Sequence, residues 1–171
     1  MKTMAIGLLT MLLSAAGLTA VPISREPARV IRVISADTLT ILYRGKWEEL
    51  KLIGPDAPET ALNDKVYEEA LRSSSTPAEV IRRGLEATEF VKRYLLYGSQ
   101  VWIEFDVQKR DRFSRLQGYV YLADGRMLNE ILLRQGLAEL FLVPPNLRYS
   151  HRFQEMIRLA RREAARPKTV K

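Results

Sequence analysis

The sequence contains no cysteine and only one histidine, His151, in 171 residues. The lack of cysteine excludes a disulfide framework, a thiolate metal site and a cysteine nucleophile, but it does not exclude an oxidising compartment. We interpret His151, near the start of an expected helix, as a surface or helix-terminal residue rather than a catalytic one. Because the chain has no cysteine and only one histidine, any metal site is expected to use oxygen ligands. The chain length suits one domain with a sizeable core.

Acidic residues are in the minority, because 27 Lys and Arg face 20 Asp and Glu. An excess of this sign favours polyanionic partners, with nucleic acid before others. Charge alone is a weak argument, since many basic proteins never bind nucleic acid. The apolar content of 47% and the charged content of 27% are ordinary for a soluble globular protein, which argues against global disorder.

The N-terminal segment has no acid before Glu26, and Lys2 precedes an apolar run from Ala5 to Leu18. This run is shorter than the roughly 20 residues that span a bilayer. With the small residue Ala20, the pattern predicts a cleavable signal peptide over residues 1–20 and a secreted or periplasmic protein; a retained membrane anchor is the alternative. A linker is expected over residues 21–28, the folded domain over 29–166 and a disordered tail over 167–171.

The rest of the chain alternates β-branched runs, turn signals and helical periodicity. Strands are predicted in five segments, which are residues 29–34, 39–43, 47–53, 101–107 and 117–122. Helices are predicted in three, which are residues 77–98, 128–135 and 147–165. Residues 61–77 look like an insertion with one or two helical turns, either a lid over a site or an idle excursion. The pattern predicts an α+β, mainly β fold: a five-stranded Greek-key barrel of the OB type with about three helices.

The stretch "IGPDAPET", residues 53–60, places Asp56 and Glu59 on a loop after the third predicted strand, stiffened by two prolines. Asp37 lies in the turn "SADT" between the first two strands, so a barrel can bring it beside Asp56. Two carboxylates at one rim repel each other unless a cation lies between them, and the expected ion is Ca²⁺ or Mg²⁺. The alternative is that both aspartates only serve turn chemistry.

A basic cluster, "QKRDRFSRLQG", precedes the fifth predicted strand and includes Arg112 and Arg115. Lys51 alternates with Leu50 and Leu52, so it lies on the opposite face of its strand from those leucines. A solvated surface loop is the ordinary interpretation of such a cluster. The convergence of acids and bases on one rim favours a functional one.

Several blocks together resemble the thermonuclease family, the proteins similar to staphylococcal (micrococcal) nuclease. The blocks are "VISADTLTILYRGK", "LKLIGPDAPET", "GLEATEFVK", "DRFSRLQGYVY", "ADGRMLNEILLRQGLA" and the basic final helix. They occur in the family's order from about Val33 onward, which is more specific than any single motif.

The resemblance implies a Ca²⁺-dependent phosphodiesterase on an OB barrel. Asp37 and Asp56 match the family's two metal carboxylates, and Ala57 matches the position that lends a main-chain carbonyl. Glu59 matches the glutamate that positions or deprotonates the attacking water. The expected enzyme is a metal-dependent nuclease with Ca²⁺ as its cofactor.

The resemblance also assigns substrate contacts. Arg115 matches one of two arginines that grip the phosphate, and Lys51 stands at the position of the other. Arg112 matches a lysine near the terminal phosphate, and Phe113 matches a tyrosine of the nucleotide pocket. The expected substrates are DNA and, as a second substrate, RNA, hydrolysed with little sequence preference by a monomer without a stable protein partner.

Three departures from the family pattern motivate a second hypothesis. Lys51 keeps a positive charge but lacks the planar fork of arginine. Ser35 and Ala36 replace an acid and a glycine beside the first metal aspartate. Phe113 has no hydroxyl group, and tyrosines expected after the second helix are missing. The alternative is therefore a catalytically weakened or inactive OB-fold protein that binds nucleic acid; a structural barrel rests on fold alone.

Overall fold

The structure, a computed structural model, describes residues 24–165, and its centre is a closed five-stranded barrel. Its strands, in the order in which they pair, are β1 (Arg25–Ser35), β2 (Thr38–Tyr43), β3 (Lys46–Leu52), β6 (Leu116–Tyr121) and β5 (Gln100–Glu104). All neighbouring pairs are antiparallel except β3 and β6, which run parallel. The five-stranded barrel predicted from the sequence is therefore confirmed, and the strand alternation buries residues such as Leu39, Ile41 and Leu50 inside it.

The first strand begins earlier than expected, at Arg25 rather than at Arg29. Residues 25–28, assigned to a linker from their prolines, pair with β5 and close the barrel; Pro27 lies opposite Trp102. The linker prediction is wrong for these residues because barrel closure supplies a distant partner strand that local signals do not contain. The predicted signal peptide, residues 21–23 and the predicted tail lie outside the described residues.

Helix α2, Pro77–Lys92, starts where the sequence places it. The Thr76 hydroxyl accepts the Glu79 N–H, and the Glu79 carboxylate accepts the Thr76 N–H, which satisfies two unpaired donors of the first turn. The helix ends at Lys92 with Arg93 as its C-cap, before the expected end at Gly98. Gly98 has a φ of +79° and instead turns the chain toward β5.

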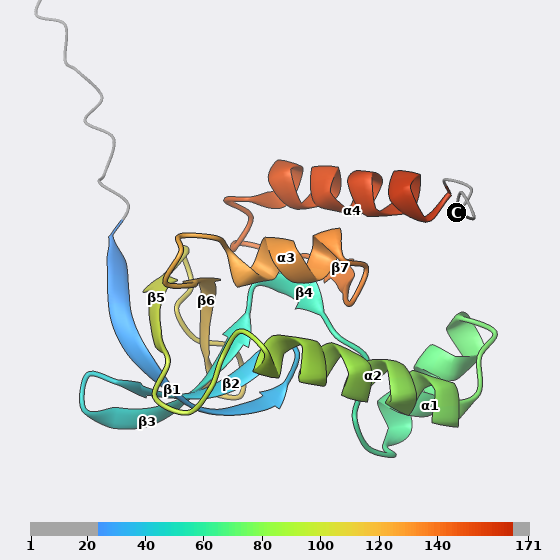
Figure 1. Ribbon diagram of the computed structural model, residues 1–171, viewed down its shortest axis with the longest axis horizontal. Helices are drawn as coiled ribbons and strands as arrows, with labels where there is room; N and C mark the ends of the chain where they lie inside the picture. Colours follow the sequence, from blue (N-terminus) through green and yellow to red (C-terminus); the bar gives the residue numbers. More distant parts are fainter. Residues whose placement is uncertain (1–23, 166–171) are drawn as a thin grey trace, which may run out of the picture.

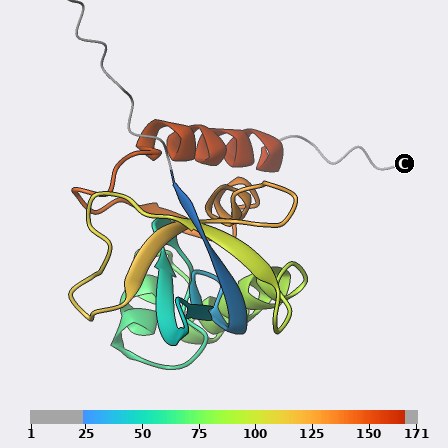
Figure 2. The ribbon, with the colours of Figure 1, turned by 90° about the vertical axis from the view of Figure 1, so that its left-hand side faces the viewer.

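The other helices surround the barrel on two sides (Figure 1). Helix α1, Asp64–Arg72, fills the predicted insertion and lies beside α2. Helix α3, Leu128–Arg134, packs on the barrel, and α4, Ser150–Ala164, forms the outermost layer over α3 (Figure 2). Within residues 24–165, none of the helices combines the length and the apolar character needed to cross a membrane.

A second, two-stranded sheet was not expected from the sequence. Strand β4, Gly54–Asp56, pairs antiparallel with β7, Glu139–Phe141. Strands of three residues are too short to show alternation. The pairing places Asp56 opposite Glu139, so a segment far away in the sequence fixes the start of the acidic loop.

Candidate functional site

Asp37 lies in the turn between β1 and β2, with a side chain only 4% exposed. Its Oδ1 accepts hydrogen bonds from the hydroxyls of Ser35 and Thr38, both at 2.9 Å. Its Oδ2 accepts the Ala57 N–H and the Lys51 ammonium, both at 2.6 Å. Burial by itself raises the pKa of Asp37, but the Lys51 charge and the hydrogen bonds outweigh it, and the pKa lies below its usual value. Asp37 is therefore held as an anion.

Asp56 ends β4 and lies close to Asp37. The Lys51 Nζ is 2.6 Å from Asp37 Oδ2 and 3.5 Å from Asp56 Oδ1. One ammonium thus bridges the two carboxylates, as expected if a barrel rim brings them together. Lys51 reaches them from β3 because it points away from the buried side chains of Leu50 and Leu52.

Glu59 follows on the loop after β4, and both oxygens of its carboxylate are held. The Asn63 amide donates to Oε2 at 3.1 Å, and the Lys65 Nζ lies 3.0 Å from Oε1. Lys65 also lies 3.1 Å from Asp56 Oδ1. Partial burial lowers the pKa of the Lys65 ammonium, but its bonds to Glu59 and Asp56 outweigh this and raise the pKa above the usual value. Lys65 is therefore a charged member of the acidic cluster.

Neither Asn63 nor Lys65 was anticipated from the sequence. Both belong to the start of α1, inside the insertion, and Asn63 is the N-cap whose side chain accepts the Val66 N–H. An asparagine before an amphipathic segment is a recognisable helix start. The sequence pattern does not show where that helix points, so the contact with Glu59 appears only in the folded molecule.

Helix α2 supports the loop of Glu59 through close backbone contact. A Cβ atom on Gly84 would lie 2.2 Å from the Glu59 carbonyl oxygen and 2.5 Å from that of Pro58. Only glycine lets the helix approach this closely. An isolated glycine within a helical pattern is the available sequence signal for such packing.

Arg115 lies just before β6, on the loop that connects β5 to that strand. Its Nε donates to Asp111 Oδ2 at 2.7 Å, and its Nη1 lies 3.5 Å from Glu49 Oε1. Glu49 and Lys51 are two residues apart on β3 and share one face of it, and Leu50 pairs with Leu116. Arg115 therefore lies along the same outer face as Lys51, with its guanidinium oriented by Asp111.

Arg112 and Phe113 lie on the exposed loop that precedes Arg115. The Phe113 side chain is 63% exposed. The guanidinium carbons of Arg112 and Arg115 lie 4.8 and 5.3 Å from its ring centre. An exposed ring flanked by two cations has the chemistry to stack on a base next to a phosphate.

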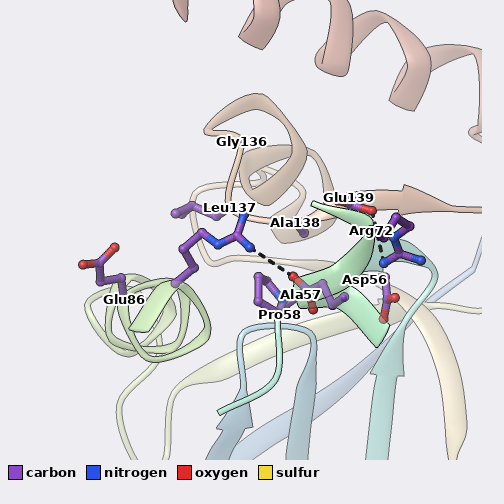
Figure 3. Close-up of a pocket in the computed structure, with 11 residues that line it drawn as sticks. Asp56, Ala57, Pro58, Arg72, Glu86, Gly136, Leu137, Ala138 and Glu139 are labelled. Atoms are coloured by element: carbon purple, nitrogen blue, oxygen red, sulfur yellow. Dashed lines mark ion pairs between the residues drawn. The ribbon is translucent and has the colours of Figure 1, made fainter. Parts of the chain in front are cut away.

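A cavity of about 260 Å³ adjoins the acidic loop (Figure 3). Asp56, Ala57 and Pro58 form one wall, and the other walls come from α1, α2 and the segment between α3 and β7. Its charged groups largely pair with each other, as in the ion pairs Arg72–Glu139 at 3.8 Å and Arg83–Glu69 at 3.7 Å. We therefore regard the cavity as the space between the supporting helices rather than as the reaction centre.

The acidic residues fit a hard cation by their chemistry. Asp37 and Asp56 supply only oxygen atoms and share one positively charged neighbour, and oxygen ligands are those that Ca²⁺ and Mg²⁺ prefer. In residues 24–165, no group of three or more His, Cys, Asp or Glu side chains is gathered around one metal position. Two lysine ammoniums, those of Lys51 and Lys65, balance the charge of the carboxylates instead.

Sequence comparison with known proteins places the chain among nucleases of this kind. Residues 49–166 match the family described as staphylococcal nuclease homologue. The chain is 35% identical to the thermonuclease of Staphylococcus hyicus over 132 residues, which are 77% of this chain and 69% of that protein. It is 35% identical to the thermonuclease of Staphylococcus intermedius over 124 residues, 72% of this chain and 65% of that protein.

A relative from another genus shows the same similarity at a lower level. Endonuclease YncB of Bacillus subtilis strain 168 is 30% identical over 125 residues, which are 72% of this chain and 52% of that protein. The matched part thus spans between 52% and 69% of these relatives. The resemblance and the enzyme class expected from the sequence are confirmed at the level of the family, since the relatives are nucleases by name. The chain belongs to the staphylococcal nuclease homologue family.

Proposed function

We propose that this chain is a secreted or periplasmic, Ca²⁺-dependent nuclease that hydrolyses DNA and, as a second substrate, RNA. The observation that carries the proposal is the convergence of Asp37, Asp56 and Glu59 around lysine ammoniums at one rim of the barrel. Lys51 lies within this cluster, and Arg115 lies along the same face of β3 through its contact with Glu49. A pure binding protein has little use for an acidic cluster that faces a polyanion.

The residues have distinct roles in phosphodiester hydrolysis. Asp37 and Asp56, with the Ala57 carbonyl, are the proposed ligands of the cation, which when bound supplies positive charge for the oxygens of the phosphoryl group. The Glu59 carboxylate takes a proton from the attacking water. The loop between Pro55 and Pro58 and the Asn63 contact hold that carboxylate in place, because small displacements are costly for catalysis.

The cationic residues act on the phosphate itself. The Arg115 guanidinium offers a planar pair of donors to two oxygens, whereas Lys51 acts as a point charge. Asp111 orients Arg115 through the 2.7 Å hydrogen bond to Nε. Contacts of this kind carry no base information, which supports low sequence preference in an enzyme that acts on the nucleic-acid backbone.

The first test is hydrolysis of single-stranded DNA by the purified protein with Ca²⁺, with Mg²⁺ and with excess chelator. Turnover only in the presence of Ca²⁺ is the expected result. DNA binding that falls with salt, without turnover under any condition, would favour the alternative of an inactive OB-fold binder. The observation behind that alternative is Lys51, whose ammonium lies among the carboxylates rather than free on the surface.

Replacing Lys51 by arginine is expected to raise kcat by about tenfold, because the fork replaces a point charge at a phosphate-binding position. The measurement is steady-state hydrolysis of single-stranded DNA, with Lys46→Arg as the control on the same strand, where the side chain is exposed. A Lys51→Arg protein no faster than the parent would remove Lys51 from the phosphate-binding set.

Replacing Phe113 by leucine is expected to raise KM about tenfold with little change in kcat, since base stacking is worth roughly 1–3 kcal/mol and acts on binding. Tyr97→Leu is a suitable control, because Tyr97 is an aromatic residue that is 83% exposed elsewhere on the surface. A fall in kcat at unchanged KM would contradict the stacking role.

A further inference from the structure

The start of helix α1 brings a lysine into the acidic site from outside the motifs that define it. Lys65 Nζ lies 3.1 Å from Asp56 Oδ1 and 3.0 Å from Glu59 Oε1. The neighbouring Asn63 holds the other oxygen of Glu59 at 3.1 Å. The first turn of α1 thus contacts two of the three acids of the site.

The position of Lys65 is fixed by the packing of its helix. Val66 and Ala70 of α1 form a small separate core with Val80 of α2, and all three are buried. At the other end of α1, the Arg72 guanidinium lies 3.8 Å from the Glu139 carboxylate of β7. Helix α1 therefore packs against α2 (Figure 1), and this packing holds Lys65 beside the site.

The critical atom is Asp56 Oδ1, because both lysines compete for it. Lys51 Nζ lies 3.5 Å from this oxygen and Lys65 Nζ lies 3.1 Å from it. An ammonium and a divalent cation on the same oxygen repel each other. The side chain of Asp56 is 27% exposed and that of Lys65 is 43% exposed, so the ammonium has room to leave.

We propose that Lys65 is an internal counter-ion that a divalent cation must displace from Asp56, so that helix α1 sets the metal affinity of the site. The inference rests on the proposed function, since it takes Asp56 as a metal carboxylate. It makes the insertion neither a lid nor an idle excursion. Without bound metal, Lys65 keeps Asp56 and Glu59 from repelling each other; with metal bound, it retains only its contact with Glu59.

The test is calorimetric titration of the metal-free protein with Ca²⁺, without substrate. Lys65→Gln is expected to lower the Kd about tenfold, which corresponds to about 1.4 kcal/mol, because the competing charge is gone. Lys65→Arg keeps the charge and is expected to leave the Kd within about threefold of the parent. Lys92→Gln, at an exposed lysine of α2 that pairs with Glu89 at 2.7 Å, is the control for loss of a lysine charge elsewhere.

The sign of the change separates competition from a merely structural role. A Lys65→Gln protein that had only lost local structure would bind Ca²⁺ more weakly. An unchanged or raised Kd would overturn the inference. Thermal unfolding offers a second measurement: the rise in Tm on adding Ca²⁺ is expected to be larger for Lys65→Gln than for the parent, because tighter binding stabilises more.

The proposed function and the inference fail in different ways. Ca²⁺-dependent hydrolysis by the parent together with an unchanged Kd in Lys65→Gln overturns only the inference. No hydrolysis with any metal, together with tighter Ca²⁺ binding by Lys65→Gln, leaves the inference standing and removes the nuclease proposal. Absence of Ca²⁺ binding by both proteins overturns the two together.

Discussion

Glu59→Gln is expected to lower kcat for hydrolysis of single-stranded DNA by about 10²–10⁴-fold, the range that a positioned general base contributes. Glutamine has nearly the same shape, but it cannot take the proton of the attacking water. Its amide also replaces one of the oxygens that Asn63 and Lys65 hold at 3.1 and 3.0 Å. The measurement is kcat at saturating DNA and Ca²⁺.

The matched control is Glu68→Gln, at an exposed glutamate on α1, which is expected to keep the parental rate. Calcium titration of Glu59→Gln separates loss of the base from loss of the metal, because Asp37 and Asp56 remain. A Glu59→Gln protein with parental kcat would show that another group, or water alone, accepts the proton.

Gly84→Ala is expected to lower kcat by about 10²-fold while the protein stays folded. The new Cβ would lie 2.2 Å from the Glu59 carbonyl oxygen, and a backbone atom cannot rotate away as a flexible side chain can. The loop and the helix must separate, and a displacement of about 1 Å is enough to cost about 10²-fold in rate. Alanine favours the helix itself by about 1 kcal/mol over glycine, so loss of helical structure does not explain such a result.

Gly125→Ala provides the contrasting case. Gly125 has a φ of +82° and no atom within 4 Å of an added Cβ, so alanine there brings backbone strain without a clash. It is expected to lower Tm and leave kcat unchanged, whereas Gly84→Ala lowers kcat. Equal rates for Gly84→Ala and the parent would mean that the loop tolerates the shift and that its position is not critical.

The residues predicted from the sequence are those whose signals are local. Asp37, Asp56 and Glu59 lie in short motifs with turn residues and prolines, and strand alternation placed Lys51 away from the buried leucines. The barrel was predictable because its strands have clear alternation and turn signals. The structure brings these side chains together, while their individual roles remain predictions for the substitutions above.

The missed features depend on contacts between distant segments. From its local sequence Pro27 looks like a linker residue, but in the structure it belongs to β1 and pairs with Trp102 of β5. Lys65 is an ordinary helix lysine in the sequence, and only the orientation of α1 makes it a neighbour of Glu59. Gly84 looks like an ordinary glycine inside a helix in the sequence, and only the structure shows the loop backbone of Glu59 lying against it. Tertiary packing, rather than local propensity, determines these features.

The pairing of β4 with β7 also bears on the order in which the molecule matures during folding. Asp56 lies opposite Glu139, so its final position requires a segment synthesised long after the β1–β3 meander. Contacts between distant segments generally form late, because the intervening chain must first be ordered. A folding chain can therefore form the β1–β3 meander from local contacts, whereas the closed barrel and the complete acidic site both require later segments, and cleavage of nucleic acid is expected only after β7 has paired.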